Sequence, residues 1–160
     1  MSLGRRVRPG EAPQTNYQTA GRRALAAGTL IVAAAGNDSA RPTVTIPVSS
    51  PANAGLIAAV AAVDSRLRVA RFSNRGINPS GGEINFAGPG VDVLSSWPMP
   101  LRLRSISGTS MATPHVAGIA ALVAEESKRF RGLELYREMR RRARRLPLPR
   151  ADVGNGLIRI

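Results

Sequence analysis

The sequence predicts an α/β fold built on a parallel sheet. Two uninterrupted apolar runs of strand length carry this prediction, Leu30–Ala35 and Leu56–Val63. Neither run alternates apolar with polar residues, which is typical of strands buried on both faces of a parallel sheet. Segments of helical pattern lie before and after them, and such alternation of strands and helices defines the α/β layer folds.

The remaining elements of the first half follow from local signals. Residues 5–20 are polar and rich in turn-forming residues, so they are predicted to form a surface loop. Thr19 is a candidate N-cap of a short helix through Ala27, which Gly28 would end. Two further short strands are predicted at Ile84–Ala87 and Val91–Leu94, separated by a Gly-Pro-Gly turn.

Two helices and a terminal strand are predicted in the second half. A helix from Ser110 to about Phe130 has an apolar first half and a polar end. A second, strongly basic helix covers Leu133–Leu146 and would end before Pro147. The last four residues, Leu157–Ile160, have the composition of a strand.

Length and composition restrict the class of protein. The 160 residues fit one domain, residues 1–160, and 43% of them are hydrophobic, as in a folded rather than a disordered chain. The absence of cysteine excludes disulfides, a cysteine nucleophile and thiolate metal sites. The longest apolar run has eight residues, whereas a membrane span needs about 20, so no membrane partner is predicted.

The net charge of +13 favours a nucleic-acid partner as an alternative function. This alternative rests on a basic region, residues 128–150, with ten basic and two acidic side chains. Runs such as Arg140-Arg141-Arg142 contain no interleaved aromatic residue for base stacking. Such runs are typical of a solvated helix face, so we expect a peripheral helix here and consider nucleic-acid binding disfavoured.

The stretch Ser107–Gly118 contains the residue types of a nucleophile site. Gly108 permits a tight turn, and Ser110 then opens an apolar helix. At a helix N-terminus, backbone N–H groups and the helix dipole stabilise developing negative charge. A serine placed there can act as a nucleophile, although an N-cap without chemistry has the same local pattern.

The whole stretch resembles the nucleophile motif of the subtilisin-like serine peptidases (peptidase S8), Gly-Thr-Ser-Met-Ala-x-Pro-His-Val-x-Gly, without a gap. Val32–Asn37 is similar to the strand and oxyanion-hole segment of that family, and Ser2–Gly4 to its Ser-Leu-Gly strand. Three more blocks agree in the family's order, Ala59–Asp64, Phe72–Gly76 and Ala87–Val93. The resemblance spans residues 2–124 and implies the C-terminal part of a parallel-sheet, three-layer subtilisin-like fold.

The resemblance implies a serine endopeptidase that hydrolyses peptide bonds of a polypeptide substrate. Ser110 would be the nucleophile, and Asn37 would donate its side-chain amide to the oxyanion. Two walls of the substrate cleft are implied, one formed by Ser2, Leu3 and Gly4 and the other by Ala34, Ala35 and Gly36.

The family also requires an Asp and a His that precede the serine. The only histidine, His115, follows Ser110 by five residues, which turn a helix through about 500° and point the two side chains about 140° apart. We interpret His115 as a helix-packing residue, and no aspartate stands in the family's Asp-Ser/Thr-Gly context. We therefore expect a C-terminal half-domain, inactive alone, whose partner is the N-terminal half.

Other properties stay open at this point. The family often binds structural calcium near the segment that matches Pro51–Ile57, but this segment has no carboxylate, so neither a metal site nor a cofactor is assigned. The family is often secreted, yet no signal-peptide pattern is visible, and no localisation is predicted. A non-catalytic relic of the fold that acts as a binding module is a further alternative.

Overall fold

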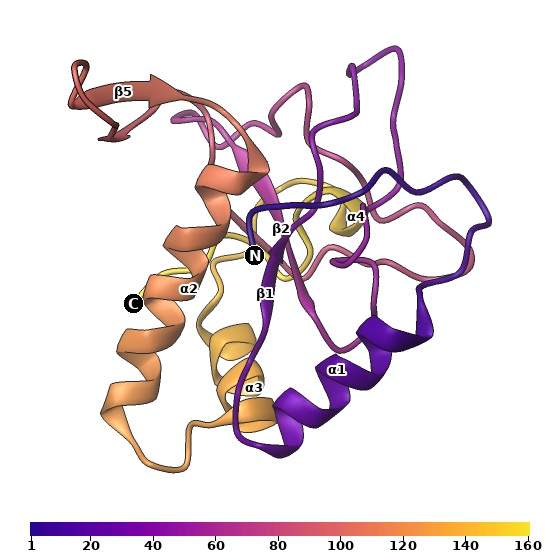
Figure 1. Cartoon of the computed structure of the whole chain (residues 1–160), viewed down its shortest axis with the longest axis vertical. Helices are drawn as coiled ribbons and strands as arrows, with labels where there is room; N and C mark the ends of the chain where they lie inside the picture. Colours follow the sequence, from indigo (N-terminus) through magenta and orange to yellow (C-terminus); the bar gives the residue numbers. More distant parts are fainter.

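The second apolar run forms the central strand of the sheet, β2 (Ala58–Val63), whose six residues are all buried. In the computed structural model, which describes all 160 residues, β2 pairs in parallel with β1 (Val32–Ala34) and with β3 (Phe86–Pro89) (Figure 1). The predicted parallel α/β sheet is therefore confirmed. Both apolar runs are strands over fewer residues than their hydrophobicity indicated.

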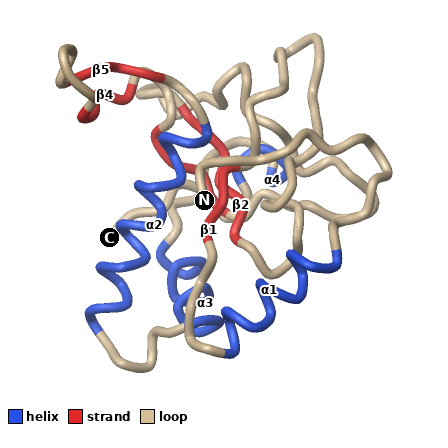
Figure 2. Tube along the Cα trace, viewed as in Figure 1, coloured by secondary structure: helices blue, strands red, loops and turns tan.

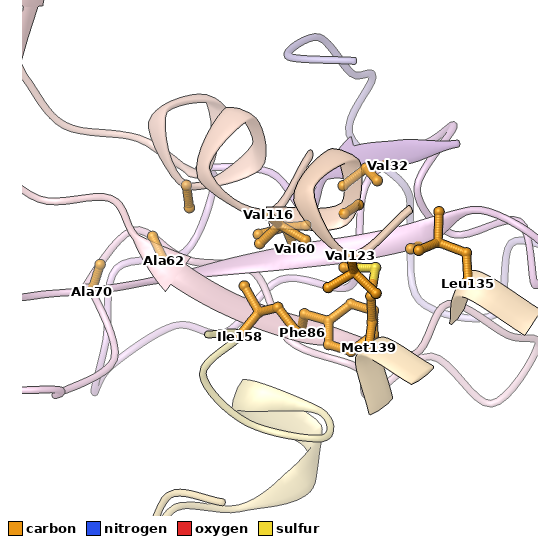
Figure 3. Close-up of a cluster of buried hydrophobic side chains, with 13 residues drawn as sticks. Val32, Val60, Ala62, Ala70, Phe86, Val116, Val123, Leu135, Met139 and Ile158 are labelled. Carbon is orange, nitrogen blue, oxygen red and sulfur yellow. The ribbon is translucent and has the colours of Figure 1, made fainter. Parts of the chain in front are cut away.

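The two faces of the sheet belong to different hydrophobic clusters. On one face Val60 of β2 and Phe86 of β3 pack with Val116, Val123 and the side chains around them (Figure 3). These partners come from α2 (Thr109–Glu126) and α3 (Gly132–Arg142). On the other face the small residues Ala59 and Ala61 pack against the loop that precedes β2. Burial on both faces explains why neither strand shows polar alternation.

The first helix differs from the prediction. Helix α1 covers Thr15–Ala26, so Thr19 lies inside it and is not its N-cap. Tyr17 packs against the hydrophobic cluster that contains Ala59 and Ala61. The polar composition of this segment predicted a loop, but the segment forms a helix that makes this tertiary contact. The predicted C-terminal end is nearly correct, because Ala27 caps the helix and Gly28 follows with a φ of +80°.

Two elements, residues 103–106 and 150–153, have no counterpart in the sequence prediction, whereas the predicted strand Val91–Leu94 forms two residues later, as Val93–Ser96. Strand β4 (Val93–Ser96) pairs antiparallel with β5 (Leu103–Ile106) in a hairpin that projects beyond the N-terminal end of α2 (Figure 2). A short helix, α4 (Arg150–Val153), follows the predicted basic helix, which itself ends at Arg142.

Two segments that were expected to be strands, residues 2–4 and 157–160, are not strands in the structure. Leu157 makes only isolated bridges, to Ala87 and to Arg144, so the C-terminal residues are not a strand. Residues Ser2–Gly4 lie outside every strand as well, although the neighbouring Met1 carbonyl accepts a hydrogen bond from Ala34 N–H at 3.0 Å. This contact places the N-terminal segment beside β1.

The basic region is less peripheral than expected. Helix α3 carries its charges on one side, while Leu135 and Met139 on the other side are buried in the cluster beneath α2. None of the helices combines the length and the apolar character needed to cross a membrane.

Candidate active site

Ser110 is the second residue of α2 and lies half-buried at its N-terminal end. Its hydroxyl donates a hydrogen bond to the carbonyl oxygen of Ser2 at 3.2 Å. The Ser2 hydroxyl in turn donates to the carbonyl oxygen of Ser110 at 3.0 Å. As one of the first amides of the helix, the N–H of Ser110 has no acceptor within the preceding turn. The hydroxyl and the amide of Ser110 therefore both lie at the N-terminal end of α2, where the helix dipole stabilises negative charge.

Asn37 is held beside Ser110 by the intervening contact with Thr109. The Asn37 Oδ1 accepts hydrogen bonds from the Thr109 N–H at 2.8 Å and from the Thr109 hydroxyl at 2.9 Å. The Thr109 Oγ1 also accepts a bond from the N–H of Gly36 at 3.1 Å. Because Oδ1 is occupied, the amide group of the exposed Asn37 points its N–H donors elsewhere, and they make no hydrogen bond in this structure.

Two glycines leave room for this arrangement. A Cβ on Gly108 would lie 3.3 Å from the Asn37 Nδ2, a tight contact that would crowd the amide. Gly36 has a φ of +108°, and a Cβ there would lie 2.3 Å from both Asn74 Nδ2 and Ser49 Oγ. A side chain at position 36 is thus excluded both by conformation and by space.

Asn74 anchors the loop that carries Asn37. Its fully buried Oδ1 accepts bonds from the N–H groups of Asp38 and Ser39 at 2.9 and 3.1 Å. Its Nδ2 donates to Asp38 Oδ2 and to the carbonyl of Pro47, both at 3.0 Å. The side chain of one residue from a later loop therefore fixes the backbone on the C-terminal side of Asn37.

A cavity of about 250 Å³ collects most of the predicted site residues. Its walls come from the N-terminal segment, the end of β1 and the start of α2. It is lined by Ser2, Leu3, Gly4, Arg6, Ala34, Gly36, Asn37, Asp38, Ser49, Thr109 and Ser110. Of the eight site residues expected from the sequence, only Ala35 is absent from this lining.

The expected place of Ala35 in the cleft wall is wrong. Its side chain is fully buried in the cluster on the second face of the sheet. Its backbone is also hydrogen-bonded within the fold. The Ala35 N–H donates to the carbonyl oxygen of Val60, and the Ala35 carbonyl oxygen accepts from the N–H of Ser49. Strand geometry explains the difference, since neighbouring side chains point to opposite faces and only Ala34 can face the cavity.

His115 lies on the exposed side of α2 and not in a packed interior, which corrects its interpretation as a helix-packing residue. Its Nδ1 lies 2.8 Å from the carbonyl oxygen of Met111 in its own helix. It does not line the cavity of Ser110. The charged residues of that cavity are Arg6 and Asp38, and Asp38 Oδ2 already accepts bonds from Asn74 and from Ser49. Ser110 therefore has no general base within hydrogen-bond reach.

Four residues of the cavity lining were not among the site residues expected from the sequence, namely Arg6, Asp38, Ser49 and Thr109. Thr109 stands inside the recognised motif, where a hydroxyl next to the serine could have been noticed. Ser49 and Asp38 carry no comparable signal, because their roles depend on the loop contacts made by Asn74.

The residues near Pro51–Ile57 do not fit a calcium site. Calcium takes six to eight oxygen ligands from carboxylates, carbonyl groups and water. The side-chain oxygen of Asn53 is buried and has no hydrogen-bond partner. One amide oxygen does not by itself form the coordination shell of a calcium ion. No group of three or more His, Asp or Glu side chains is placed to hold a metal ion.

A serine at the start of a helix, beside a free asparagine amide on a parallel α/β sheet, is the arrangement expected on the nucleophile side of a serine-hydrolase site. The comparison with known families agrees with this class. The sequence model of the "Subtilase family" (peptidase S8) matches residues 1–156. The chain belongs to the subtilase family.

Individual relatives cover nearly the whole chain. A "Thermostable alkaline protease" of Halalkalibacterium halodurans is 38% identical over 99% of this chain and 39% of its own length. The "Major intracellular serine protease" of Bacillus subtilis is 32% identical over 99% of this chain and 48% of its own length. Among solved structures, "Sphericase" superposes with a TM-score of 0.81 at 30% identity, over 99% of this chain and 55% of that one. The chain thus spans about two-fifths to one-half of these relatives.

Proposed function

We propose that this chain provides the nucleophile half of a subtilisin-like serine endopeptidase site. The observation that carries the proposal is the position of Asn37 beside Ser110. Two hydrogen bonds from Thr109, the residue before Ser110, fix the orientation of the Asn37 amide. The family membership and the protease names of the relatives support the same reaction class.

The proposed chemistry is acyl transfer. The Ser110 oxygen attacks the peptide carbonyl carbon, its proton passes to a general base, and the carbonyl oxygen becomes an oxyanion. The Ser110 N–H and the Asn37 amide donate hydrogen bonds to that oxyanion. The proton then passes from the base to the leaving amine, and water releases the acyl group from Ser110.

The general base must come from outside the residues described above. Ser110 donates to a backbone carbonyl, and the single histidine faces away from it. A neutral serine without a base is a weak nucleophile. We therefore propose that a complementary polypeptide segment supplies the Asp and His of the triad, and that the chain by itself is not competent.

Reconstitution tests this proposal. The chain is co-expressed with the part of the Halalkalibacterium halodurans protease that the match does not cover, and hydrolysis of an unstructured protein substrate is followed. We expect peptidase activity in the mixture that is abolished by Ser110→Ala and retained by His115→Gln.

A stable complex without Ser110-dependent hydrolysis would contradict the endopeptidase proposal and favour the non-catalytic binding module. The binding-module function would then be tested by calorimetry, which measures the binding of substrate-derived peptides to the unmodified chain. Loss of activity in His115→Gln in a folded complex would show that His115 belongs to the machinery.

A further inference from the structure

A group of arginine side chains surrounds a second cavity, which shares no lining residue with the cavity of Ser110. This cavity, of about 490 Å³, lies where the C-terminal end of α3, the following loop and α4 meet. Four arginines line it, Arg140, Arg141, Arg145 and Arg150, and no acidic residue does.

Three of these arginines have no anionic partner. The guanidinium groups of Arg140, Arg145 and Arg150 form neither a salt bridge nor a hydrogen bond within the chain. Arg141 pairs with Glu138, but Glu138 also binds Arg142. The carboxylate of Glu138 is thus already shared between two cations, and the cavity keeps an excess of positive charge.

The floor of the cavity is apolar and fixed. Leu146 and Val153 are buried there and pack with β2 and β3 residues. The backbone N–H groups of the lining residues 154–156 all make hydrogen bonds within the chain. They donate to the carbonyl oxygens of Arg150, Asn85 and Val153. The charged donors that this cavity offers to a ligand are therefore the arginine guanidinium groups, with Leu146 and Val153 behind them.

The geometry points to a compact polyanion as the ligand, and we propose that this cavity binds a condensed phosphate group, either as a free chain or as part of a nucleoside triphosphate. Guanidinium forks match the oxygens of phosphate with paired, charge-assisted hydrogen bonds. A cavity of this size admits a small molecule. A condensed phosphate concentrates several charges in that space, whereas an acidic peptide spreads one charge per residue over a longer chain.

A nucleic-acid strand fits the observations less well. No aromatic residue lines the cavity, so bases have no stacking surface there. The proposal is independent of the endopeptidase proposal, because neither Ser110 nor Asn37 takes part in it.

Titration calorimetry of the 160-residue chain at about 0.15 M salt, where long-range attraction between exposed charges is largely screened, tests the proposal. Sodium tripolyphosphate is expected to bind with a 1:1 stoichiometry. Each arginine removed should weaken the binding by about tenfold, so the triple variant Arg140→Gln, Arg145→Gln, Arg150→Gln should lose it. The single variant Arg145→Gln gives a second reading if the triple variant fails to fold by circular dichroism.

The matched control is Arg22→Gln, Arg23→Gln, Arg66→Gln, which removes the same charge from exposed arginines outside the cavity. It should bind tripolyphosphate as the unmodified chain does. Tighter binding of ATP than of tripolyphosphate would assign the phosphate to a nucleotide, and equal or weaker binding to the free chain. No saturable binding, equal loss in the control, binding of citrate as tight as that of tripolyphosphate, or preference for a single-stranded oligonucleotide would each overturn the proposal.

Discussion

The side-chain oxygen of Asn37 accepts two hydrogen bonds from one residue, the N–H and the hydroxyl of Thr109. Thr109 is fully buried and directly precedes Ser110. The residue before Ser110 therefore sets the direction in which the asparagine amide points. This coupling ties Asn37, the proposed oxyanion donor, to the start of α2, although Asn37 and Thr109 are 72 positions apart.

The first prediction concerns the amide of Asn37 in the reconstituted enzyme. Asn37→Asp keeps an oxygen for Thr109 but removes the N–H donors. We expect kcat to fall by about 10²–10³ with little change in KM, the loss known for one such donor in a subtilisin, because the amide acts on charge that exists only in the transition state. Thr109→Ser keeps both bonds to Asn37 and should leave kcat within a few-fold. An unchanged kcat in Asn37→Asp would remove Asn37 from the oxyanion site.

The second prediction concerns Ser110 in the chain without a partner. Because no base lies within reach of the hydroxyl, the purified chain should hydrolyse peptides no faster than Ser110→Ala. Loss of a triad member lowers kcat by several orders of magnitude, about 10⁴–10⁶. A sensitive fluorogenic peptide assay measures both proteins side by side. A rate that depends on Ser110 would show that the chain contains its own base.

The third prediction concerns Asn74 and folding stability. Asn74→Ala leaves the N–H of Asp38 and the carbonyl of Pro47 without their side-chain partner. We expect the free energy of unfolding in urea to fall by about 2–4 kcal/mol, as for other losses of a buried hydrogen-bonding network. The exposed Asn16→Ala is the control and should change it by less than about 0.5 kcal/mol. A similar small change in Asn74→Ala would mean that the loop holds its shape without this side chain.

The fourth prediction concerns pH. Hydrogen bonds from Arg141 and Arg142 lower the pKa of Glu138 from 4.5 to about 2. A carboxyl whose pKa is lower in the folded state stabilises the fold above its unfolded pKa, and this contribution disappears as the pH falls to its folded pKa. The difference in urea midpoint between the unmodified chain and Glu138→Gln should thus be greatest above about pH 5 and vanish near pH 2. A difference in urea midpoint that does not depend on pH would show that the pairing of Glu138 with arginine does not cause the stabilisation.

The control substitution is Glu125→Gln, because Glu125 is exposed and forms no salt bridge.

The sequence by itself determined the central sheet, the long helix and the positions of Ser110 and Asn37. These features have local causes, because uninterrupted apolar runs specify strands buried on both faces and the motif specifies a turn into a helix. Only the tertiary structure decided that Thr109 orients Asn37, that Asn74 anchors the following loop, and that Ala35 faces the core. It also decided the start of α1 and the arginine-lined cavity. These features arise from contacts between segments far apart in the chain, and no local pattern of residues encodes which distant backbone group a side chain will meet.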